Sequence, residues 1–515
     1  MPPLTSGRRT AVLATVCLAV FAINLDVTIV NVALPSMSRQ LGAGTSTLQW
    51  VVDGYSLAFA SLVLTGGSVG DRIGRRPVLI AGLLGFAAAS ALGGVFHSAA
   101  ALVALRFVMG AFAAFIYPTT LSIITNAYPD RAERARAIGV WGAVTGIGVA
   151  VGPLTGGLLL AHYWYGSVFL ALVPAALVAA IAATAIVPES REPGAAPLDL
   201  PGLITSSAAI CLLVYTIIEA PHYGWGAPRT IAGFVVTALI GAVFVIVERR
   251  ARAPMLDVTL FRVPAFSAAS GAVTVSFFAL FGFIFLITQY FQFIRLYGAL
   301  STGVRILPVA VSIAVGSVLG ARLAGRLGTR VVVVTGLVLF GLSFAWIALS
   351  TVTEPYLQIA AQMVIMGTGL GLTSTPATES ILSVLPPAKA GVGSAVNDAT
   401  REAGGALGVA VIGSVFNSVY QHQLAGSPLQ ALPAAAVAAA RDSVGAALAI
   451  ARNAGLEHSV INSFMDGLHF ACAIAAAVCF AGAVAAVKLP GRQQRAASTV
   501  VSAPAHAAEP VSEER

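Results

Sequence analysis

Long runs of hydrophobic residues recur along the whole chain, separated by short segments that hold most of its charged residues. A helix needs about 20 apolar residues to cross the hydrocarbon core of a bilayer, and the runs have this length. The pattern therefore predicts an all-α polytopic membrane protein. We place fourteen transmembrane helices at residues 11–33, 48–70, 78–96, 99–124, 138–160, 165–187, 200–218, 230–247, 265–288, 304–326, 331–350, 356–380, 397–419 and 467–487.

The composition agrees with the hydrophobic pattern. Of the 515 residues, 57% are hydrophobic and 10% are charged, whereas about 25% of the residues of soluble domains are charged. The net charge of +8 comes from basic residues in the short loops, where positive charge sets the orientation of a membrane protein. The positive charge is therefore no indication of nucleic-acid binding.

Arginines are concentrated in alternate loops. If the N-terminus is cytoplasmic, the cytoplasmic loops carry the arginine clusters and the outer loops carry few basic residues, as the positive-inside rule requires. The charged start MPPLTSGRRT precedes an apolar run that is too long for a signal peptide. We therefore expect a retained first span, both termini in the cytoplasm and a multi-pass protein of the cell (cytoplasmic) membrane.

A weak internal repeat relates the two halves of the chain. The segment GSVGDRIGRR (67–76) follows the second span, and ARLAGRLGTR (321–330) follows the tenth. Repeated halves are common in transporters. We therefore expect an N-terminal six-helix bundle in 1–190, two inserted transmembrane helices in 198–250 and a C-terminal six-helix bundle in 262–490.

Two segments do not have the pattern of a span. Residues 420–466 are rich in alanine but interrupted by Arg441, Asp442 and Arg452, which favours a short amphipathic helix in an extracellular loop. Residues 491–515 are small and polar, as is typical of a disordered cytoplasmic tail.

Three ionisable residues lie inside the first four predicted spans. An ionisable side chain in lipid costs about 2.5–3.5 kcal/mol, so such residues usually face a bundle interior. Asp26 and Arg106 are both roughly 10 Å below the outer surface, and Asp53 lies nearer the outer mouth. We interpret them as a proton-coupling group; the alternative is a static salt bridge that orients helices.

The second half holds a further set of charges. Asp398, Arg401 and Glu402 stand at i, i+3 and i+4 and share one helical face, and Glu379 lies in the preceding span. These residues form either a secondary charge site or a local ion pair. The four cysteines lie in apolar runs without metal-ligand spacing, so we expect buried hydrophobic side chains and no metal site: Cys17, Cys211, Cys472 and Cys479.

The loop at residues 67–76 combines charges with regularly spaced glycines. Gly67 and Gly70 allow close helix approach and Gly74 allows a sharp reversal, while Asp71 could stabilise a helix N-terminus or pair with Arg131 or Arg134. Ordinary cytoplasmic positive charge is the alternative explanation for the arginines. The residues assigned to this conformational motif are Gly67, Gly70, Asp71, Arg72, Gly74, Arg75 and Arg76.

The fifth span contains the stretch GVAVGPLTGGLL at 148–159. Gly148, Gly152 and Gly156 recur every four residues and line one side of a helix, where another backbone can approach closely. Pro153 leaves the carbonyl of Val149 without its helical donor. Together with Gly157, these residues predict a kinked gating seam, although a glycine-packed structural helix accounts for the three spaced glycines.

These motifs resemble those of the major facilitator superfamily, and specifically its fourteen-spanner drug:proton antiporter family. The resemblance rests on the 67–76 loop and on LVALRFVMG (102–110), GVAVGPLTGGLL and NLDVTIVNVALP (24–35). It rests also on TQYFQ (288–292), STGVRILP (301–308), MGTGLGLTSTP (366–376) and GVGSAVNDATREAGGALGVAVIG (391–413). It implies two pseudo-symmetric six-helix bundles plus two linker helices, with Arg106 involved in proton transfer and Asp26 as the acidic residue of the first-span motif.

The chain departs from the family pattern at several positions. Met109 replaces a usual glutamine, and HYWYGSVFLALVP (162–174) lacks the frequent Trp-Arg-Trp run. Asp398 stands where asparagine is more usual, and Glu402 where glutamine is common. These departures leave the fold unchanged but argue against borrowing one relative's substrate.

We therefore expect a proton-coupled antiporter, acting as a monomer in the lipid bilayer, that exports small hydrophobic or cationic drugs. It would use the proton gradient and no cofactor. A dedicated exporter of one metabolite is the alternative, and proton-coupled uptake is a weaker one. The sequence holds no nucleotide-binding loop or nucleophile–base pair that would indicate an enzyme. The expected substrate-lining residues are Phe21, Tyr55, Phe59, Tyr117, Phe278, Phe285, Gln289 and Tyr290.

Overall fold

The computed structural model describes residues 5–191, 198–252, 254, 256–384 and 390–489. Fourteen helices in this part of the chain are long and apolar enough to cross a membrane, which confirms the predicted count. They are α1 (Ser6–Leu41), α2 (Thr45–Ile73), α3 (Arg75–Val95), α4 (Ala99–Ala127), α5 (Arg131–His162), α6 (Ser167–Leu170) continued by α7 (Leu172–Ile186), α8 (Leu200–Tyr223), α9 (Pro228–Arg250), α10 (Pro264–Gln289), α11 (Ala299–Leu327), α12 (Thr329–Ile347), α13 (Tyr356–Ser383), α14 (Ala390–Ala425) and α17 (Glu457–Ala486).

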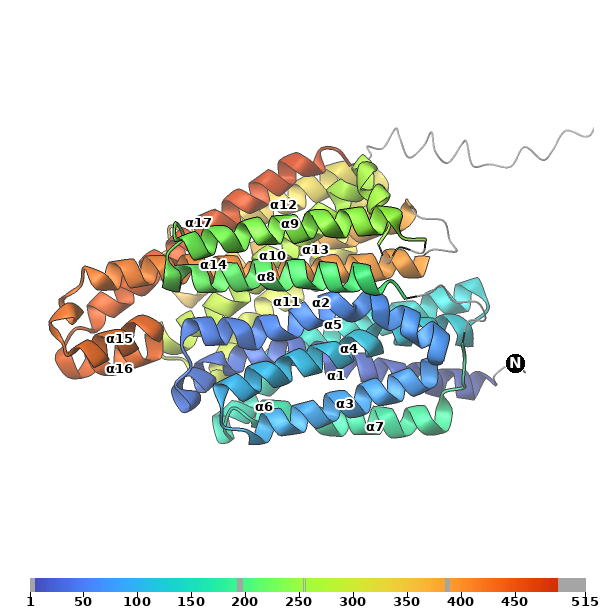
Figure 1. The fold of residues 1–515 in the computed structure, drawn as a ribbon, viewed down its shortest axis with the longest axis horizontal. Coiled ribbons are helices and arrows are strands. Elements are labelled where there is room, and N and C mark those ends of the chain that lie inside the picture. Colours follow the sequence, from blue (N-terminus) through green and yellow to red (C-terminus); the bar gives the residue numbers. More distant parts are fainter. Residues whose placement is uncertain (1–4, 192–197, 253, 255, 385–389, 490–515) are drawn as a thin grey trace, which may run out of the picture.

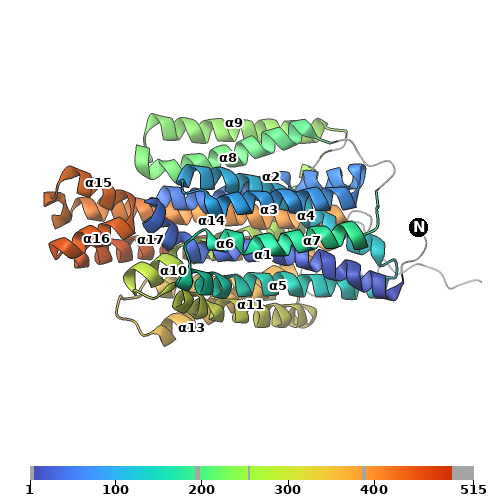
Figure 2. The ribbon, with the colours of Figure 1, turned by 90° about the horizontal axis from the view of Figure 1, so that it is seen from below.

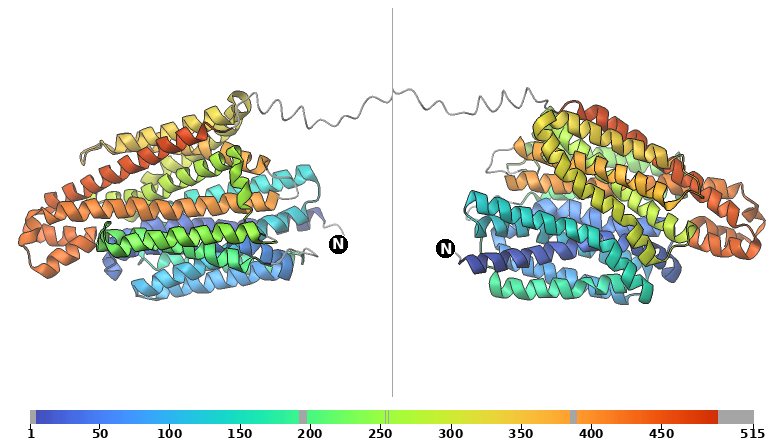
Figure 3. Two further views of the ribbon diagram at one scale, coloured as in Figure 1. Left: turned by 45° about the horizontal axis from the view of Figure 1, so that its top comes forward. Right: turned by 180° about the vertical axis from the view of Figure 1, so that it is seen from behind.

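The helices form two groups that run side by side. Helices α1–α7 make one group and α10–α14 with α17 make the other (Figures 1 and 3). Corresponding helices pack alike, because α1 contacts α5 as α10 contacts α14, and α2 contacts α4 as α11 contacts α13. The two groups meet through α5 against α11 and α14 against α2. The architecture is therefore pseudo-symmetric.

The sequence repeat marks equivalent turns in the two groups. Gly74 joins α2 to α3 with φ +127°, and Gly328 joins α11 to α12 with φ +89°. Glycine adopts these conformations at little cost because it has no Cβ. Each turn is also closed by the glycine N–H, which donates to the carbonyl of Gly70 or Ala324. The repeat thus encodes one tight turn used twice.

Helices α8 and α9 stand outside the two groups (Figure 2). Helix α8 packs against α2 and α14, whereas only 6% of the apolar window of α9 is buried in the protein. An apolar helix with so little protein contact is suited to a lipid environment.

Short helices protrude at the end of the molecule opposite to the N-terminus (Figures 1 and 2). We call this the distal end and the other the N-terminal end. Residues 420–466, for which one short helix was expected, hold the end of α14, a 3-10 turn η4 (Pro428–Ala431), α15 (Ala434–Asp442), α16 (Val444–Ala454) and the start of α17. Ser443 separates α15 from α16 because its hydroxyl accepts a bond from Ala446 N–H and caps α16. The predicted tail at 491–515 lies outside the described residues.

Candidate functional site

A buried ion pair joins α1 to α4. Asp26 and Arg106 are 0% and 1% exposed, and one guanidinium nitrogen donates to both carboxylate oxygens at 2.8 and 2.7 Å. The Nε of Arg106 donates to the carbonyl of Val51 at 2.8 Å, and the guanidinium lies over the Tyr55 ring at 4.5 Å. Arg106 therefore ties α1, α2 and α4 together at one point.

Asp53 is also buried, with a different environment. It is 0% exposed, and neither carboxylate oxygen has a hydrogen-bond partner among the residues that the structure describes. A proton taken up by Asp53 would break no ion pair in the described structure. A proton taken up by Asp26 would have to compete with Arg106.

A cavity lies between the two helix groups and next to the ion pair. About 340 Å³ of space free of protein atoms, open solvent included, lies within its lining. Its lining comes from α1, α2 and α4 on one side and α14 on the other: Ile23, Asn24, Val27, Tyr55, Phe59, Tyr117, Asp398, Arg401 and Glu402. Tyr55 both lines this central cavity and carries Arg106 on its ring. It therefore connects the central cavity with the buried pair.

The central cavity combines aromatic rings with an excess of carboxylates. Arg401 lies 3.8 Å from Asp398 and over the Phe277 ring at 4.4 Å, whereas Glu402 Oε2 has no partner among the described residues. Tyr55, Phe59 and Tyr117 form a chain of ring contacts. An organic cation is the ligand that rings and an unpartnered carboxylate would stabilise together.

The structure separates the predicted substrate residues into two sets. Tyr55, Phe59 and Tyr117 line the central cavity. The remaining five are absent from its lining. Phe21 belongs to α1, where its backbone lies against Gly148 of α5. The other four are buried residues of the C-terminal group: Phe278, Phe285, Gln289 and Tyr290.

The predicted charge site is likewise divided. Asp398, Arg401 and Glu402 line the central cavity, whereas Glu379 lies on an exposed face of α13. The prediction also left out Ile23, Asn24 and Val27, which line the cavity from α1. Asn24 was a detectable signal, because it is a polar residue within an apolar span and lies two positions before Asp26.

The segment 67–76, predicted as a loop, is helical except at Gly74, so Gly67 and Gly70 lie within α2. Its glycines permit tight contacts near the N-terminal end. A Cβ on Gly70 would lie 3.0 Å from Thr119 Oγ1, and a Cβ on Gly67 would contact Pro118. Asp71 forms an ion pair with Arg75 at 2.8 Å, four residues on. Its possible pairing with Arg131 or Arg134 stays a prediction, because the Arg131 side chain lies outside the described residues. Arg76 bonds to the carbonyl of Thr184, while Arg72 is exposed.

The glycine seam of α5 has two partners. Gly148, Gly152 and Gly156 face α1 so closely that a Cβ would press against Asn24, Thr28 or Ile29. The hydroxyl of Thr28 donates at 3.1 Å to the carbonyl of Val149, which Pro153 leaves without its helical donor. The kink is therefore stabilised by a hydrogen bond from α1.

The same seam joins the two helix groups. A Cβ on Gly157 would lie 2.7 Å from the Leu300 Cα, and one on Gly303 of α11 would overlap the Pro153 carbonyl oxygen. Helices α5 and α11 thus touch backbone to backbone. This contact requires glycine on both sides.

Further bonds join the groups towards the distal end. Gln49 donates to the carbonyls of Val409 and Ala410 at 3.0 and 3.1 Å. Gln292 donates to the carbonyl of Val32 at 2.9 Å, and the hydroxyls of Ser38 and Ser443 are 3.1 Å apart. The molecule is therefore closed at its distal end by contacts from α1, α2 and α5.

Comparison with known proteins gives this architecture a family. The model of the Major Facilitator Superfamily matches residues 16–409. The chain belongs to the major facilitator superfamily. As a superfamily member, it is a multi-pass membrane transporter.

Its relatives include named drug exporters. The Multidrug efflux pump LfrA of Mycolicibacterium smegmatis is 36% identical, over 87% of this chain and 88% of the relative. The Tetracenomycin C resistance and export protein of Streptomyces glaucescens is 32% identical, over 93% of this chain and 91% of the relative. The Multidrug resistance protein Stp of Mycobacterium tuberculosis H37Rv is 36% identical, over 78% and 74%.

A solved transporter shares the fold. The structure of a bacterial homologue of the human lysosomal transporter Spinster, in an inward-facing and occupied conformation, superposes with a TM-score of 0.63. It is 16% identical and covers 94% of this chain and 97% of that one. At this identity the similarity concerns the fold.

Proposed function

We propose that this superfamily member is a proton-coupled antiporter that exports small hydrophobic cations across the cytoplasmic membrane. The central cavity carries the proposal, because it joins aromatic rings of the N-terminal group to the carboxylates of α14. The named drug exporters among its relatives support export of drugs as the activity.

The direction of transport follows from an orientation with both termini in the cytoplasm. The arginine-rich loops favour that orientation, which makes the distal end the outer end. The closed distal end then corresponds to the state that receives cargo from the cytoplasm. Rocking of the two groups about the central cavity would release the cargo outside.

Cargo binding relies on the lining of the central cavity. Glu402 Oε2, which has no partner among the described residues, accepts a hydrogen bond from the cation. Tyr55, Phe59 and Tyr117 contact the apolar surface of the cargo. Asp398 is less available because Arg401 lies beside it. An exporter that needs one negative charge and a set of rings tolerates cargoes of different shape.

Energy coupling relies on the buried pair. A proton entering from outside neutralises Asp26 and breaks its ion pair with Arg106. The Arg106 guanidinium can then change its position relative to the Tyr55 ring, which lines the central cavity. A difference of about 1.4 kcal/mol between two conformations changes their ratio tenfold. Asp53, which is buried without a partner among the described residues, helps the proton reach Asp26. The proton gradient supplies the energy, so the cycle needs no cofactor.

A second candidate is export of a single metabolite. The Tetracenomycin C resistance and export protein, whose name gives one compound, matches 93% of this chain. Accumulation assays over a chemically varied panel separate the two candidates. A single exported compound would favour the dedicated exporter.

The charge of Glu402 tests the proposed cargo site. In cells lacking their own pumps, we expect Glu402→Gln to weaken export of a monocationic dye about tenfold, a loss of about 1.4 kcal/mol. Export of a neutral dye should change little. Glu379→Gln is the matched control, because it removes an exposed carboxylate outside the central cavity. Equal loss of both dyes, or equal loss in the control, would contradict the proposal.

A further inference from the structure

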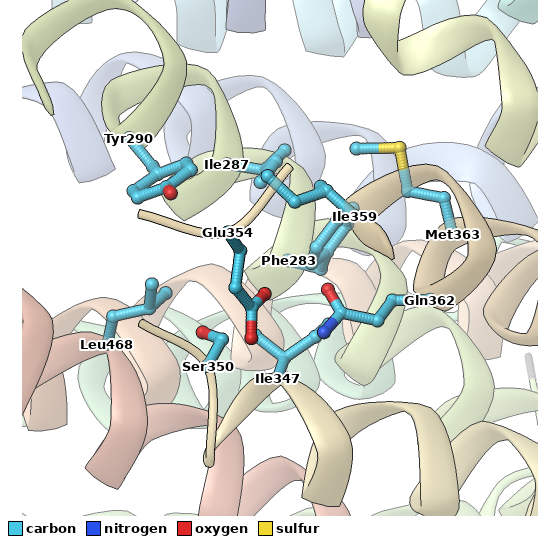
Figure 4. A pocket seen from close by; sticks show the side chains of 10 residues that line it. All are labelled: Phe283, Ile287, Tyr290, Ile347, Ser350, Glu354, Ile359, Gln362, Met363 and Leu468. Carbon is cyan, nitrogen blue, oxygen red and sulfur yellow. The ribbon is translucent and has the colours of Figure 1, made fainter. Parts of the chain in front are cut away.

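A second cavity lies inside the C-terminal helix group, beside the α12–α13 turn at the distal end. Figure 4 shows its lining side chains. About 370 Å³ of space free of protein atoms, open solvent included, lies within its lining. Tyr290, the α12–α13 turn with Ser350 and Glu354, Gln362 of α13 and Leu468 of α17 line it. All these residues come from one group, so this distal cavity is separate from the central cavity between the groups.

Two buried polar groups point into the distal cavity without a partner. Glu354 is 8% exposed and Gln362 is 2% exposed. Glu354 Oε1 accepts a bond from Gln358 Nε2 at 2.6 Å, but Glu354 Oε2 and Gln362 Nε2 have no partner among the described residues. Figure 4 shows the carboxylate and the amide facing the same space. A buried polar atom without a partner costs about 1–3 kcal/mol, which a ligand would recover.

The neighbouring charges leave the Glu354 carboxylate available. The guanidinium of Arg295 donates to the backbone carbonyls of Val352 and Glu354 at 2.7 and 2.9 Å. The ring of His469 is bonded to the carbonyl of Ser350 at 2.7 Å. Within the described chain, no ion pair to the Glu354 carboxylate is formed.

The rest of the lining is apolar. Phe283, Ile287 and Leu468 contribute hydrocarbon surface beside the carboxylate and amide. A ligand that satisfies all of these groups has a cationic donor for Glu354, an oxygen acceptor for Gln362 and a small hydrophobic body. This combination describes an amino alcohol with an apolar substituent.

We propose that the distal cavity is a second ligand site, which binds a small amphipathic ammonium compound. Its ammonium group bonds to Glu354 Oε2 and its oxygen accepts from Gln362 Nε2. Its apolar part lies against Phe283, Ile287 and Leu468. The site differs from the proposed cargo site in both its residues and its helix group.

The distal cavity is connected to the contact that closes the distal end. Tyr290 begins the π-helical turn η2 (Tyr290–Ile294), and the same turn carries Gln292, which bonds to Val32 of the other group. Phe293, also in η2, packs under Gly445 of α16. A ligand beside Tyr290 therefore stabilises the closed distal end and slows conformational exchange. This effect on export rests on the proposed function, whereas the binding itself does not.

Binding to the purified full-length protein in lipid nanodiscs tests the site. The probe is 2-amino-1-phenylethanol, measured by isothermal titration, with neutral 1-phenylethanol as the comparison. We expect two binding events, of which Glu354→Gln weakens one at least tenfold and Glu402→Gln weakens the other. Gln362→Leu should weaken the same event as Glu354→Gln, and Asp466→Asn, which removes an exposed carboxylate of α17, should weaken neither.

The outcomes separate this proposal from the proposed function. A single binding event that Glu402→Gln abolishes and Glu354→Gln leaves unchanged would overturn the distal site, as would equal binding of the neutral probe. Failure of the proposed function would instead appear as the absence of dye export by the parent protein. Because Gln362→Leu retains the carboxylate, it provides an independent test if Glu354→Gln does not fold.

Discussion

Arg106 forms more contacts than a simple ion pair requires. It bonds to the Asp26 carboxylate and the Val51 carbonyl and lies on the Tyr55 ring. The sequence was enough to place Asp26 and Arg106 at similar depth, because helical rise converts position into depth. The contacts with α2 could not be predicted, since they depend on how that helix is rotated. That Asp53 has no hydrogen-bond partner among the described residues also depends on the rotation of α2.

Double-mutant analysis tests the strength of the buried pair. Removing one member of such a pair costs about 3–5 kcal/mol because the other charge stays buried. We expect Asp26→Asn and Arg106→Gln each to lower the thermal stability of the purified protein strongly, and the double variant to lose less than the sum. Additive losses would contradict a direct interaction.

The exposed pair Arg452–Glu457 is the control for this measurement. Its side chains are 62% and 40% exposed, and exposed ion pairs contribute about 0–1 kcal/mol. We expect Arg452→Gln and Glu457→Gln to change stability little. A control as costly as the buried pair would show that burial is not the cause.

At the scale of the element, α5 shows what local sequence predicts and what it does not. The proline identifies Val149 as the carbonyl without a helical donor. Its replacement donor, Thr28, is 121 residues away and becomes its neighbour only through the packing of α1 on α5. The spaced glycines likewise predict a close contact, but the partners α1 and α11 come from the fold.

Alanine substitution tests the backbone contact between α5 and α11. We expect Gly157→Ala or Gly303→Ala to destabilise the closed distal end, since the new Cβ meets backbone atoms and overpacking costs about 1–3 kcal/mol. Efflux should fall at least about fivefold. Gly146→Ala in the same helix is the control, because no described atom lies within 4 Å of its Cβ position. Equal effects at Gly146 would indicate helix propensity rather than contact.

A reversible cross-link tests the contact between α1 and the α15–α16 region. The hydroxyls of Ser38 and Ser443 are 3.1 Å apart, so Ser38→Cys with Ser443→Cys should form a disulfide. We expect oxidation to stop efflux and reductant to restore it, because the distal end could no longer open. The variants Ser38→Cys alone and Ser443→Cys alone control for the substitutions. Full efflux in the oxidised double variant would refute a moving contact here.

At the scale of the whole molecule, hydropathy predicted the number and order of the spanning helices. It underestimated several lengths; α1 extends to Leu41, well past the predicted end at residue 33. The polar end of α1 is stabilised by tertiary contacts such as that of Ser38 with Ser443, which a hydropathy pattern does not contain. The short repeat predicted two halves, while their meeting through α5 and α11 required the structure.

The packing of the two halves also explains why the sequence did not predict which aromatic residues line the central cavity. Aromatic residues were expected from both halves, but the central cavity takes its predicted aromatic lining from α2 and α4 and its charges from α14. The predicted residues of α10 are buried but absent from the lining of the central cavity. Depth along a span can be predicted from sequence, whereas the direction a helix faces depends on its neighbours.

Proton movement driven by cargo tests the central claim most directly. The purified protein is placed in liposomes that contain a pH-sensitive dye. Control samples receive membrane-impermeant buffer without the cation. We predict that a cationic cargo drives proton flux through the parent protein. Asp26→Asn should bind the cation but move no protons. Proton flux in Asp26→Asn equal to that of the parent would contradict the account.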